Sequence, residues 1–400
     1  MAISVLYIHH SGVFGGASRS LMELIQAFPN GEVQAHLLTQ VGQVPTVFRE
    51  RAIPVIDTVG LTQLDQTRYG YYRGLRWLIL LREIAYIPFT IVGVLRAKYK
   101  WKNIDLIHVN EVTNIFSILL VKFIFQCPIV VHVRSVQQTE SASWRMEFVL
   151  WVLNRAESII AIDLRVRNSL NHCQQVNIIH NGLNLTNNEY VSKQYLDNFS
   201  EQTMTIVFVG SLSKMKGIYE LLAAAKLCAD KEMNVKFFVV GEAPKKVGGI
   251  KSYILNKLGY TSDIKGFCKS FIAENGLEHI VDFSGFTLDI ESVYKNADLV
   301  CFPSHLNAVG RPVIEAALYG VPSIVAIDGS PDDTITHRET GFCIKEKSSE
   351  SLFSAIEYFY TQPREIERMG KNAYDLAQTK FNIKHNAKRV IELYKRSLSK

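Results

Sequence analysis

The segment from Asp298 to Asp328 constrains the fold more than any other part of the chain, because it contains a complete strand–loop–helix–strand unit. The apolar run from Leu299 to Pro303 predicts a buried strand, and a polar loop separates it from a short helix that Pro312 is expected to open. Ser323 to Ile327 predicts the next strand. Such a unit is typical of a parallel α/β sheet, which binds ligands in the loops at the carboxyl ends of its strands.

The start of that helix is an expected anion-binding position. Proline is favoured in the first turn because its missing N–H group would have no partner there. We expect the N–H groups of Val313 and Ile314 to stay free and to point, with the helix dipole, at a ligand above Gly310. Glu315, one turn further on, is expected to bind a pair of hydroxyls, as of a ribose or hexose beneath a phosphate. A helix start with a dipole-matching glutamate and no ligand is an equally open alternative at this point.

The composition is that of an ordinary globular protein, with 48% hydrophobic and 20% charged residues, and a length of 400 residues predicts two or more domains. A formal charge of +6 permits an anionic substrate or membrane surface and does not by itself argue for nucleic acid. The six cysteines form no CxxC pair, so we expect reduced core residues of a cytosolic protein. Residues 1–10 run directly into a strand, which predicts that no signal peptide is present.

Alternating strands and helices fill the first half of the chain, with strands expected at 3–10, 33–39, 53–57, 105–109, 129–133, 158–162 and 176–180. The first strand leads into a turn that contains Gly15 and Gly16, an arrangement that accommodates phosphate. This turn is not GxGxxG and lacks the acidic residue that a nicotinamide ribose requires, which disfavours a dehydrogenase. Asn181-Gly182 ends this half, and the polar stretch 184–202 is expected to be an interdomain linker.

The second half repeats the pattern, with strands expected at 204–209, 235–240 and 280–283 and a helical tail at 349–400. The strand at 204–209 leads into Gly210 to Gly217, where Lys216 beside a glycine can reach a phosphate as a point charge. Without that context, a solvated surface lysine is the alternative. The strand at 235–240 ends in Gly241-Glu242.

The segment from Arg68 to Lys102 has an unusual composition, with eight basic residues and Glu83 as its one acid. Arg82, Glu83 and Pro88 interrupt its apolar part, and a spanning helix needs about 20 predominantly apolar residues, so we do not expect a transmembrane helix. A basic, aromatic helix lying on an anionic membrane is one interpretation. An amphipathic helix packed on the sheet with solvated charges is the other.

Short motifs along the chain point to one family. They are Gly15-Gly16-Ala17-Ser18-Arg19, Asn181-Gly182, Gly210…Lys216-Gly217, Gly241-Glu242, Ala297-Asp298, Pro303-Ser304 and Gly310…Glu315-Ala316…Gly320-Val321-Pro322. In this order and at this spacing they resemble glycosyltransferase family 4, over nearly the whole chain. The resemblance implies the GT-B fold, with two Rossmann-like parallel-sheet domains facing across a cleft. The acceptor-side domain would span 1–183 and the donor-binding domain 203–380, with a helix at 381–400 crossing back to the first domain.

The resemblance also implies a retaining transfer from a nucleotide-diphosphate sugar, with no metal and no other cofactor. Lys216 would bind the diphosphate and neutralise the leaving group, Glu315 would hold the ribose, and Asn307 would hydrogen-bond sugar hydroxyls. These three are the catalytic candidates. The other donor-binding candidates are Gly15, Gly16, Gly210, Ser211, Gly241, Glu242, Ala308, Val309, Gly310 and Arg311, and the acceptor-side candidates are His132 and Arg134.

Three positions depart from the family's pattern. Ser211 stands where the family often has arginine, so one cation for the diphosphate is missing. Asn307 stands where the family has the first of two acids, and an amide cannot act as a nucleophile, which favours same-face attack by the acceptor over a covalent intermediate. Arg134 stands at the position of an acceptor-side histidine and suits an anionic group, such as a lipid-linked diphosphate. His132, on the same face of the strand, is either a substitute for that histidine or a structural residue.

The leading hypothesis is a retaining hexosyltransferase that builds a cell-surface polysaccharide on a glycan or lipid-linked acceptor. We expect it to be cytoplasmic, or peripheral on the inner face of the cell membrane. A non-catalytic sugar-nucleotide-binding or partner subunit is the alternative, supported by Asn307 and Ser211. A sugar-nucleotide epimerase on a similar fold is a third reading, and it predicts conversion of the donor without an acceptor.

Overall fold

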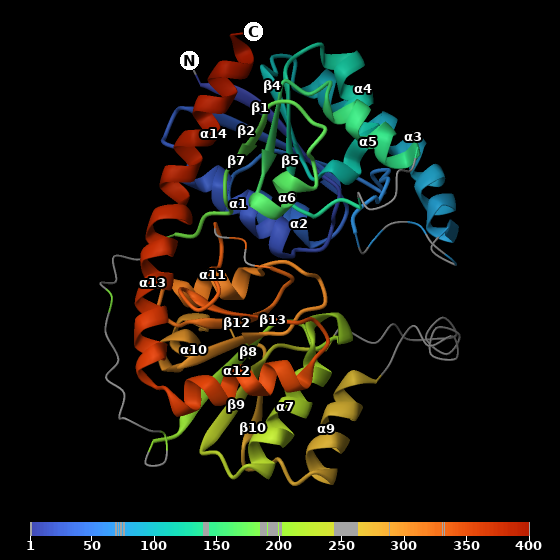
Figure 1. The fold of residues 1–400 in the computed structure, drawn as a ribbon. Coiled ribbons are helices and arrows are strands. Elements are labelled where there is room, and N and C mark those ends of the chain that lie inside the picture. The colour runs from blue at the N-terminus through green and yellow to red at the C-terminus, as the bar shows by residue number, and fades with distance from the viewer. Residues whose placement is uncertain are drawn as a thin grey trace. The chain divides into compact units, whose positions relative to one another are not determined.

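The chain folds into two compact units, which are described separately (Figure 1). The computed structural model describes residues 2–399 except 69, 71, 73, 75–76, 139–143, 185–189, 191–198, 200–201, 244–262, 288, 330 and 332. Unit 1 comprises Met1–Leu185 with Lys380–Lys400, and unit 2 comprises Thr186–Thr379. The division falls close to the expected ends of the first domain and of the C-terminal helix. The expected linker at 184–202 lies largely outside the described residues.

Unit 1 is built on a seven-stranded sheet in the order β3-β2-β1-β4-β5-β6-β7, and every adjacent pair is parallel. The central strands β1, β4 and β5 are buried along their whole length, as apolar runs in a sheet covered on both faces must be. The strands are β1 (Ile3–His9), β2 (Val33–Gln40), β3 (Val55–Thr58), β4 (Leu106–Asn110), β5 (Ile129–Val133), β6 (Ser158–Ala161) and β7 (Val176–Ile178).

Helices cover both faces of this sheet, and alternate residues of β1 point to opposite sides. Tyr7 packs with helices α1, α2 and α14 on one face. Leu6 and Ile8 pack with helices α3, α4, α5 and α6 on the other face. The helices are α1 (Gly16–Ala27), α2 (Gln43–Arg49), α3 (Trp77–Lys100), α4 (Ile115–Phe125), α5 (Trp144–Leu153), α6 (Leu164–Asn168) and α14 (Ile383–Leu398), with a short 3-10 turn at Val112–Asn114.

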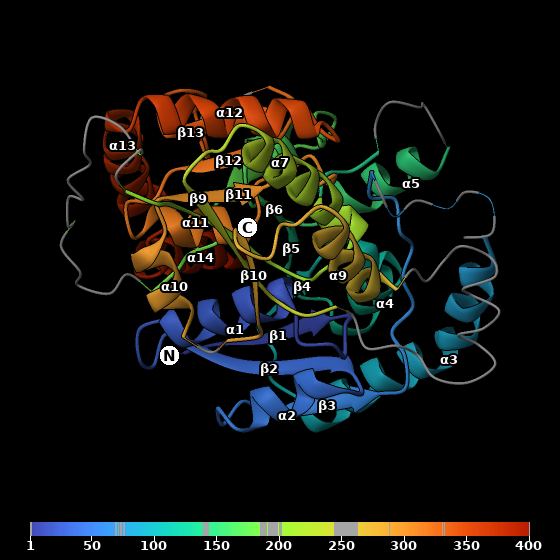
Figure 2. The ribbon, with the colours of Figure 1, turned by 90° about the horizontal axis from the view of Figure 1, so that it is seen from below.

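Unit 2 has a six-stranded parallel sheet in the order β10-β9-β8-β11-β12-β13 (Figure 2). Its strands are β8 (Met204–Val209), β9 (Val235–Val240), β10 (Val281–Gly285), β11 (Leu299–Phe302), β12 (Ser323–Ala326) and β13 (Gly341–Ile344). The main core packs α7 (Ile218–Asp230), α9 (Ile264–Glu274) and α12 (Ser349–Thr361) on one face. Residues of α10 (Ile290–Asn296) and α11 (Arg311–Ala317) pack on the other face, and α13 (Arg364–Lys380) follows α12.

The strand order fixes where loops diverge in each sheet. In unit 1 the chain runs from β1 to one neighbour, β2, and later returns to the other neighbour, β4. Unit 2 repeats this arrangement, with β9 on one side of β8 and β11 on the other. At such a switch point the loops after the two central strands turn to opposite faces and leave a crevice, where open α/β sheets bind ligands. The loops concerned are those after β1 and β4 in unit 1, and after β8 and β11 in unit 2.

Strand β13 was not expected, because Gly341 to Ile344 is too short to show a pattern. The apolar segment that Arg82, Glu83 and Pro88 interrupt in composition folds as one helix, α3, which continues through all three residues and is 24 residues long. By length and composition α3 is apolar enough to cross a membrane, with a mean hydropathy of 1.9 over 18 residues, of which 22% are buried. One such helix is weak evidence of spanning, because core helices pass the same test.

Candidate functional site

In unit 2 the two loops of the switch point are tied together by their backbones. The 3-10 turn Lys214–Lys216 follows β8, and its Met215 carbonyl accepts hydrogen bonds from His305 N (3.0 Å) and Ser304 Oγ (3.2 Å) of the loop after β11. Gly217 ends the turn with φ +77°, and a Cβ built there would lie 2.0 Å from the Pro303 carbonyl oxygen. Only glycine therefore lets this turn approach the second loop so closely.

Phe302, the last residue of β11, links Lys216 to the start of α11. A Cβ built on Gly310 would lie 2.2 Å from Phe302 Cζ, so the backbone at Gly310 rests directly on the ring. Lys216 Nζ lies 5.2 Å from the centroid of the same ring, within the range of a cation–π contact. Burial lowers the pKa of Lys216. A partly desolvated ammonium at this place gains from an anionic partner.

Tyr294 of α10 and Arg311 of α11 both contact the carboxylate of Glu315. Its Oε2 accepts a hydrogen bond from the Tyr294 hydroxyl (3.0 Å), and its Oε1 pairs with Arg311 Nε (2.6 Å). The expectation about the helix amides needs correction: Val313 N–H is not free, because it donates to the Gly310 carbonyl at 3.1 Å.

Asn307 is 1% exposed and adopts the left-handed backbone conformation, with φ +46°. Its side chain forms a reciprocal pair with Asp328, which follows β12. Asn307 Nδ2 donates to Asp328 Oδ2 at 2.8 Å, and Asp328 N donates to Asn307 Oδ1 at 2.8 Å. The amide thus joins the loops after β11 and β12, and its contact with a sugar stays a prediction. Asp332, which forms an acidic pair with Asp333 in the sequence, lies outside the described residues.

The remaining unit 2 candidates lie on the neighbouring loops. A Cβ on Gly241, which has φ +143°, would lie 1.9 Å from Gly210 O, so the ends of β8 and β9 also meet closely. Leu212 N donates to Glu242 O at 3.0 Å, and the side chains of Ser211 and Glu242 are exposed. Val309 packs against the cluster that contains Phe302, and Ala308 is half-buried.

Four candidates belong to unit 1. Gly15 and Gly16 are exposed at the start of α1, and a Cβ on either would meet no atom of the described residues within 4 Å. Packing within unit 1 therefore does not require these two glycines. Sequence reasoning did not single out Gly12. Packing in unit 1 does require glycine at this position, because a Cβ there would lie 2.0 Å from Val41 O.

His132 and Arg134, the acceptor-side candidates, are part of a buried polar network. Arg134 Nε donates to Asn110 Oδ1 at 2.6 Å, and Arg134 Nη1 donates to Asn181 Oδ1. Arg134 Nη2 lies 3.3 Å from His132 Nδ1. This network uses the guanidinium internally, which makes Arg134 a positioning group in the structure rather than an exposed anion ligand. Its role toward an acceptor stays a prediction.

The network extends across the sheet because polar residues of β1, β4 and β5 lie side by side in the strand register. His9 is paired with Asn110 and Asn110 with His132 in the strand register, and His108 Nδ1 lies 2.6 Å from the Tyr394 hydroxyl of α14. Burial, with the nearby Arg134 charge, lowers the pKa of His9 and of His108 to about 3 and also lowers that of His132. The three imidazoles are therefore neutral at pH 7.

Glu111 is a second residue of unit 1 that sequence reasoning missed. It follows β4 at the switch point, is 5% exposed, and has φ +104°, a value that a residue with a side chain rarely adopts. Its carboxylate accepts from Val112 N (2.9 Å), Arg134 N (3.2 Å) and Ser135 Oγ (2.9 Å). Burial raises the pKa of Glu111 to about 7. The one available signal was an acidic residue directly after a buried strand.

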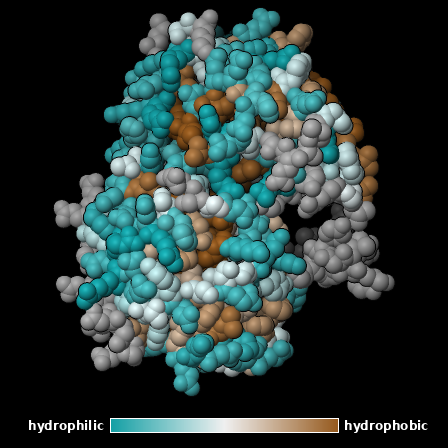
Figure 3. All heavy atoms as spheres, viewed as in Figure 1, coloured by the Kyte–Doolittle hydropathy of each residue, from teal (hydrophilic) through white to brown (hydrophobic). Residues whose placement is uncertain are grey.

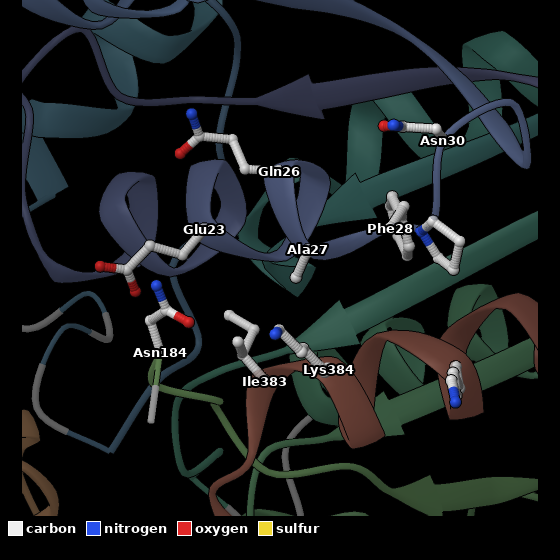
Figure 4. Close-up of a pocket in the computed structure, with 10 residues that line it drawn as sticks. Glu23, Gln26, Ala27, Phe28, Asn30, Asn184, Ile383 and Lys384 are labelled. Atoms are coloured by element: carbon white, nitrogen blue, oxygen red, sulfur yellow. The ribbon is translucent and has the colours of Figure 1, made fainter. Parts of the chain in front are cut away.

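A groove in unit 1 lies away from all of these residues (Figure 4). It has a volume of about 490 Å³ and runs between α1 and the start of α14. Glu23 and Gln26 line it from α1, and Lys384 and Lys388 from α14. None of the predicted site residues contributes to it. Within the described residues, no cluster of three or more histidine, cysteine, aspartate or glutamate side chains could hold a metal ion.

Comparisons with known families agree on both halves of the chain. Residues 14–187 match the profile of Glycosyltransferase Family 4, and residues 197–376 match that of Glycosyl transferases group 1. The capsular polysaccharide biosynthesis glycosyltransferase CapM of Staphylococcus aureus is 25% identical over 281 residues, which cover 65% of this chain and 68% of CapM. A 2-deoxystreptamine N-acetyl-D-glucosaminyltransferase of Niallia circulans is 30% identical over 136 residues, 34% of this chain and 31% of that protein.

Solved structures match over nearly the whole chain. HepE of Anabaena in complex with UDP aligns with a TM-score of 0.74 and 20% identity, covering 98% of this chain and all of HepE (100%). The sucrose-phosphate synthase of Thermosynechococcus elongatus aligns with a TM-score of 0.71 and 19% identity, over 99% of each chain. At these identities the likeness shows the fold, two parallel-sheet α/β domains of the GT-B type, and this fold agrees with the one expected from the sequence.

Proposed function

This chain belongs to glycosyltransferase family 4, and from that premise we propose that it transfers a sugar from a nucleotide-diphosphate sugar to a glycan or lipid-linked acceptor, with retention of configuration, in cell-surface polysaccharide synthesis. Two likenesses support the donor and the pathway. HepE was solved with UDP, a nucleoside diphosphate, and CapM is named for capsular polysaccharide biosynthesis. The observation that carries the proposal is the arrangement of Lys216, Phe302 and Gly310 at the switch point of unit 2.

Lys216 is the group best suited to the diphosphate. Its ammonium is partly buried and rests on an aromatic ring, and loss of hydration lowers its pKa, so it gains more from an anion than an exposed lysine does. In the transfer, the bond between the sugar carbon and the diphosphate oxygen breaks, and negative charge develops on that oxygen. An ammonium held in place stabilises this charge without reorganisation. We therefore assign the leaving-group role to Lys216 and expect no metal to be needed.

Glu315 and Asn307 take positioning roles. Tyr294 and Arg311 orient the Glu315 carboxylate, which suits an acceptor for the two ribose hydroxyls of the donor. Asn307 is not a nucleophile, because an amide nitrogen and oxygen do not displace a diphosphate. The route that fits these residues is attack by the acceptor hydroxyl on the face from which the diphosphate leaves.

The test compares two lysines of one turn, because Lys214 is exposed and Lys216 is half-buried. We expect Lys216→Met to weaken binding of the cognate sugar nucleotide about 10- to 100-fold, since a hydrogen bond to a charged group contributes roughly 1.5–3 kcal/mol. Lys214→Met should change binding by less than about threefold, in keeping with the small effects of surface substitutions. A thermal-shift screen identifies the donor first, because a ligand at a hundredfold its Kd adds about 2.7 kcal/mol of stability.

Two outcomes contradict the proposal. If Lys216→Met and Lys214→Met bind the donor equally well, Lys216 does not hold the diphosphate. If the parent binds the donor tightly but neither hydrolyses nor transfers it with any acceptor, the non-catalytic alternative replaces the enzyme.

A further inference from the structure

Helix α3 has one face fixed to unit 1. Glu83 and Thr90 are buried, and they accept hydrogen bonds from the backbone of the preceding loop: Gln63 N donates to Glu83 Oε2 (2.9 Å) and Thr62 N to Thr90 Oγ1 (2.8 Å). Val94 and Ala97 pack into the core on the same side. A helix held in this way by protein along one face cannot be surrounded by lipid.

The opposite face of α3 is apolar and open to solvent. Its exposed fractions are 62% for Leu78, 65% for Leu81, 54% for Ile84, 41% for Phe89, 53% for Val92 and 49% for Leu95. These six residues, here called the α3 ridge, follow the three- and four-residue spacing of one helix face. Figure 3 shows hydrophobic residues along the right-hand edge of the molecule, where α3 lies in Figure 1.

The ridge lacks the polar side chains of an ordinary surface helix. No charged residue occurs between Glu83 and Arg96, and Arg82 is the one exposed charge before them in α3. The inner face of α3 is therefore packed against unit 1, as one of the two interpretations expects. The solvated charges that this interpretation expects do not occur on the ridge. A contiguous exposed apolar face of this length marks an interaction surface.

Charges and aromatic residues at the ends of α3 indicate the partner. Arg96, Lys98, Lys100 and Lys102 stand within seven positions, with no acid among them. Trp77 is 46% exposed at one end of the helix and Tyr99 is 83% exposed at the other. Basic clusters are attracted to anionic lipid head groups, and exposed Trp and Tyr favour the depth of those head groups. Apolar side chains between two such ends fit a lipid surface with the helix lying in its plane.

The same helix lines a pocket. Arg82 and Tyr86 close one side of a pocket of about 360 Å³ whose other walls are the loops after β1 and β2. Polar side chains dominate the lining: His10 and Ser11 follow β1, Gln40 ends β2, Gln43 begins α2, and Gln63 lies in the segment between β3 and α3. Amide and hydroxyl groups of this kind bind sugar hydroxyls. Residues of one helix thus face both a prospective membrane and a polar pocket of the acceptor-side unit.

We propose that α3 lies in the plane of an anionic membrane surface with the α3 ridge inserted, and that the pocket lined by Arg82 and Tyr86 takes the sugar end of an acceptor carried by that membrane. The membrane contact stands on α3 alone, and the identity of the pocket's ligand rests on the proposed function. Insertion is driven by the ridge, and the basic end adds attraction that depends on anionic lipid and on salt.

The first test is cosedimentation with vesicles of phosphatidylcholine, with and without phosphatidylglycerol. Leu81→Gln/Leu95→Gln removes two ridge side chains and should lower the partition coefficient about a hundredfold or more, because burying each leucine is worth roughly tenfold or more. The matched control is Phe286→Gln, which changes a residue of unit 2 that is 68% exposed, and it should bind as the parent does. Equal binding by ridge variant and parent overturns the proposal.

The second test measures depth. In a Trp144→Phe/Trp151→Phe background, Trp77 is the exposed fluorophore and Trp101 is buried. Lipids brominated near the head group should quench Trp77 more than lipids brominated near the chain ends. Stronger quenching by the deep bromines indicates insertion across the bilayer and overturns the in-plane arrangement. If the ridge variant loses self-association in sedimentation velocity while vesicle binding is unchanged, a second copy covers the ridge and the proposal is wrong.

Donor turnover separates this proposal from the proposed function. The ridge variant should hydrolyse the sugar nucleotide at the parent's rate in the absence of vesicles. Loss of vesicle binding with intact hydrolysis supports the membrane proposal. If the parent binds vesicles but does not turn over the donor, the membrane proposal stands and the proposed enzymatic function is wrong. For the pocket, Gln43→Ala should raise KM for a membrane-borne acceptor, and an unchanged KM overturns the pocket assignment.

Discussion

Replacing Asn307 by aspartate tests how the loop after β11 is built. The two side chains have the same shape, and aspartate tolerates the left-handed conformation at φ +46° better than most residues. The change converts the Nδ2 donor, 2.8 Å from Asp328 Oδ2, into a carboxylate oxygen. The hydrogen bond from Asp328 N to the other oxygen is retained. The variant thus places two like charges in contact and removes one donor.

The magnitude follows from two competing processes. Two charges about 3 Å apart repel by roughly 5–6 kcal/mol at an effective dielectric constant near 20, and solvent around the exposed Asp328 reduces this figure. Proton uptake limits the cost, because protonating one carboxyl with a pKa near 4 takes about 2.7 kcal/mol at pH 6 and more at higher pH. We expect Asn307→Asp to destabilise unit 2 by roughly 2–4 kcal/mol at pH 8, and by less than about 1.5 kcal/mol at pH 5, where a shared proton restores the donor.

Urea unfolding followed by circular dichroism measures this difference, and the tryptophans supply an internal reference. All four, Trp77, Trp101, Trp144 and Trp151, belong to unit 1, so their fluorescence does not report on unit 2 directly. The control is the exchanged pair Asn307→Asp/Asp328→Asn, in which the amide and the carboxylate trade places and the donor returns. We expect it to recover at least half of the lost stability. A variant Asn307→Asp as stable as the parent at pH 8, or a loss that does not shrink with acid, refutes the reasoning.

Two further predictions concern stability. Gly217→Ala should cost about 2 kcal/mol or more, because φ is +77° there and the new Cβ would lie 2.0 Å from Pro303 O. Gly276→Ala should cost only about 1 kcal/mol, because φ is +63° there and no atom of the described residues lies within 4 Å of the new Cβ. Equal shifts in thermal unfolding would contradict the loop contact. The folded pKa of His108, about 3, lies below its unfolded value of 6.5, so its neutral form stabilises the fold above pH 6.5 and this contribution is lost as the pH falls toward 3. Between pH 8 and 5 the loss is about 2 kcal/mol, and His108→Gln should flatten the pH dependence of unfolding by that amount; an unchanged slope would show that His108 is not buried as a neutral group.

The parallel strands were accessible from the sequence because each is a short apolar run followed by glycine or a polar loop. The strands β5, β8 and β9 have the expected bounds. The loops that meet at the switch point of unit 2 were also indicated, because Lys216-Gly217 and Gly310 mark places where the backbone must approach another group. Their physical partners, Pro303 O and the Phe302 ring, lie far along the chain or on the preceding strand. Pattern alone does not reveal such contacts.

The surroundings of the acceptor-side candidates could not be predicted from the sequence either, because they depend on contacts between distant segments. His9, His108 and His132 look like isolated histidines in apolar strands, and their common network depends on strand register. The strained Glu111 depends on tertiary hydrogen bonds from the loop after β5. For α3, sequence indicated a membrane or a packed helix, and only the burial of Glu83 and Thr90 shows that one face is packed and the other open.

The switch point of each unit contains a cation, Arg134 in unit 1 and Lys216 in unit 2, and the two have different partners. This difference indicates which cation binds a ligand and which one supports the fold. Arg134 of unit 1 uses its guanidinium on Asn110, Asn181 and His132, so its charge is committed to the fold. Lys216 of unit 2 contacts the Phe302 ring and, in the described part of the chain, no carboxylate. Burial lowers the pKa of Lys216, which means that the ammonium has lost part of its hydration. A half-buried cation without a counter-charge is costly in the free protein, and an anion that pairs with it recovers this cost on binding. Lys216 is therefore the cation expected to act on the substrate, and Arg134 is the one expected to hold unit 1 in shape.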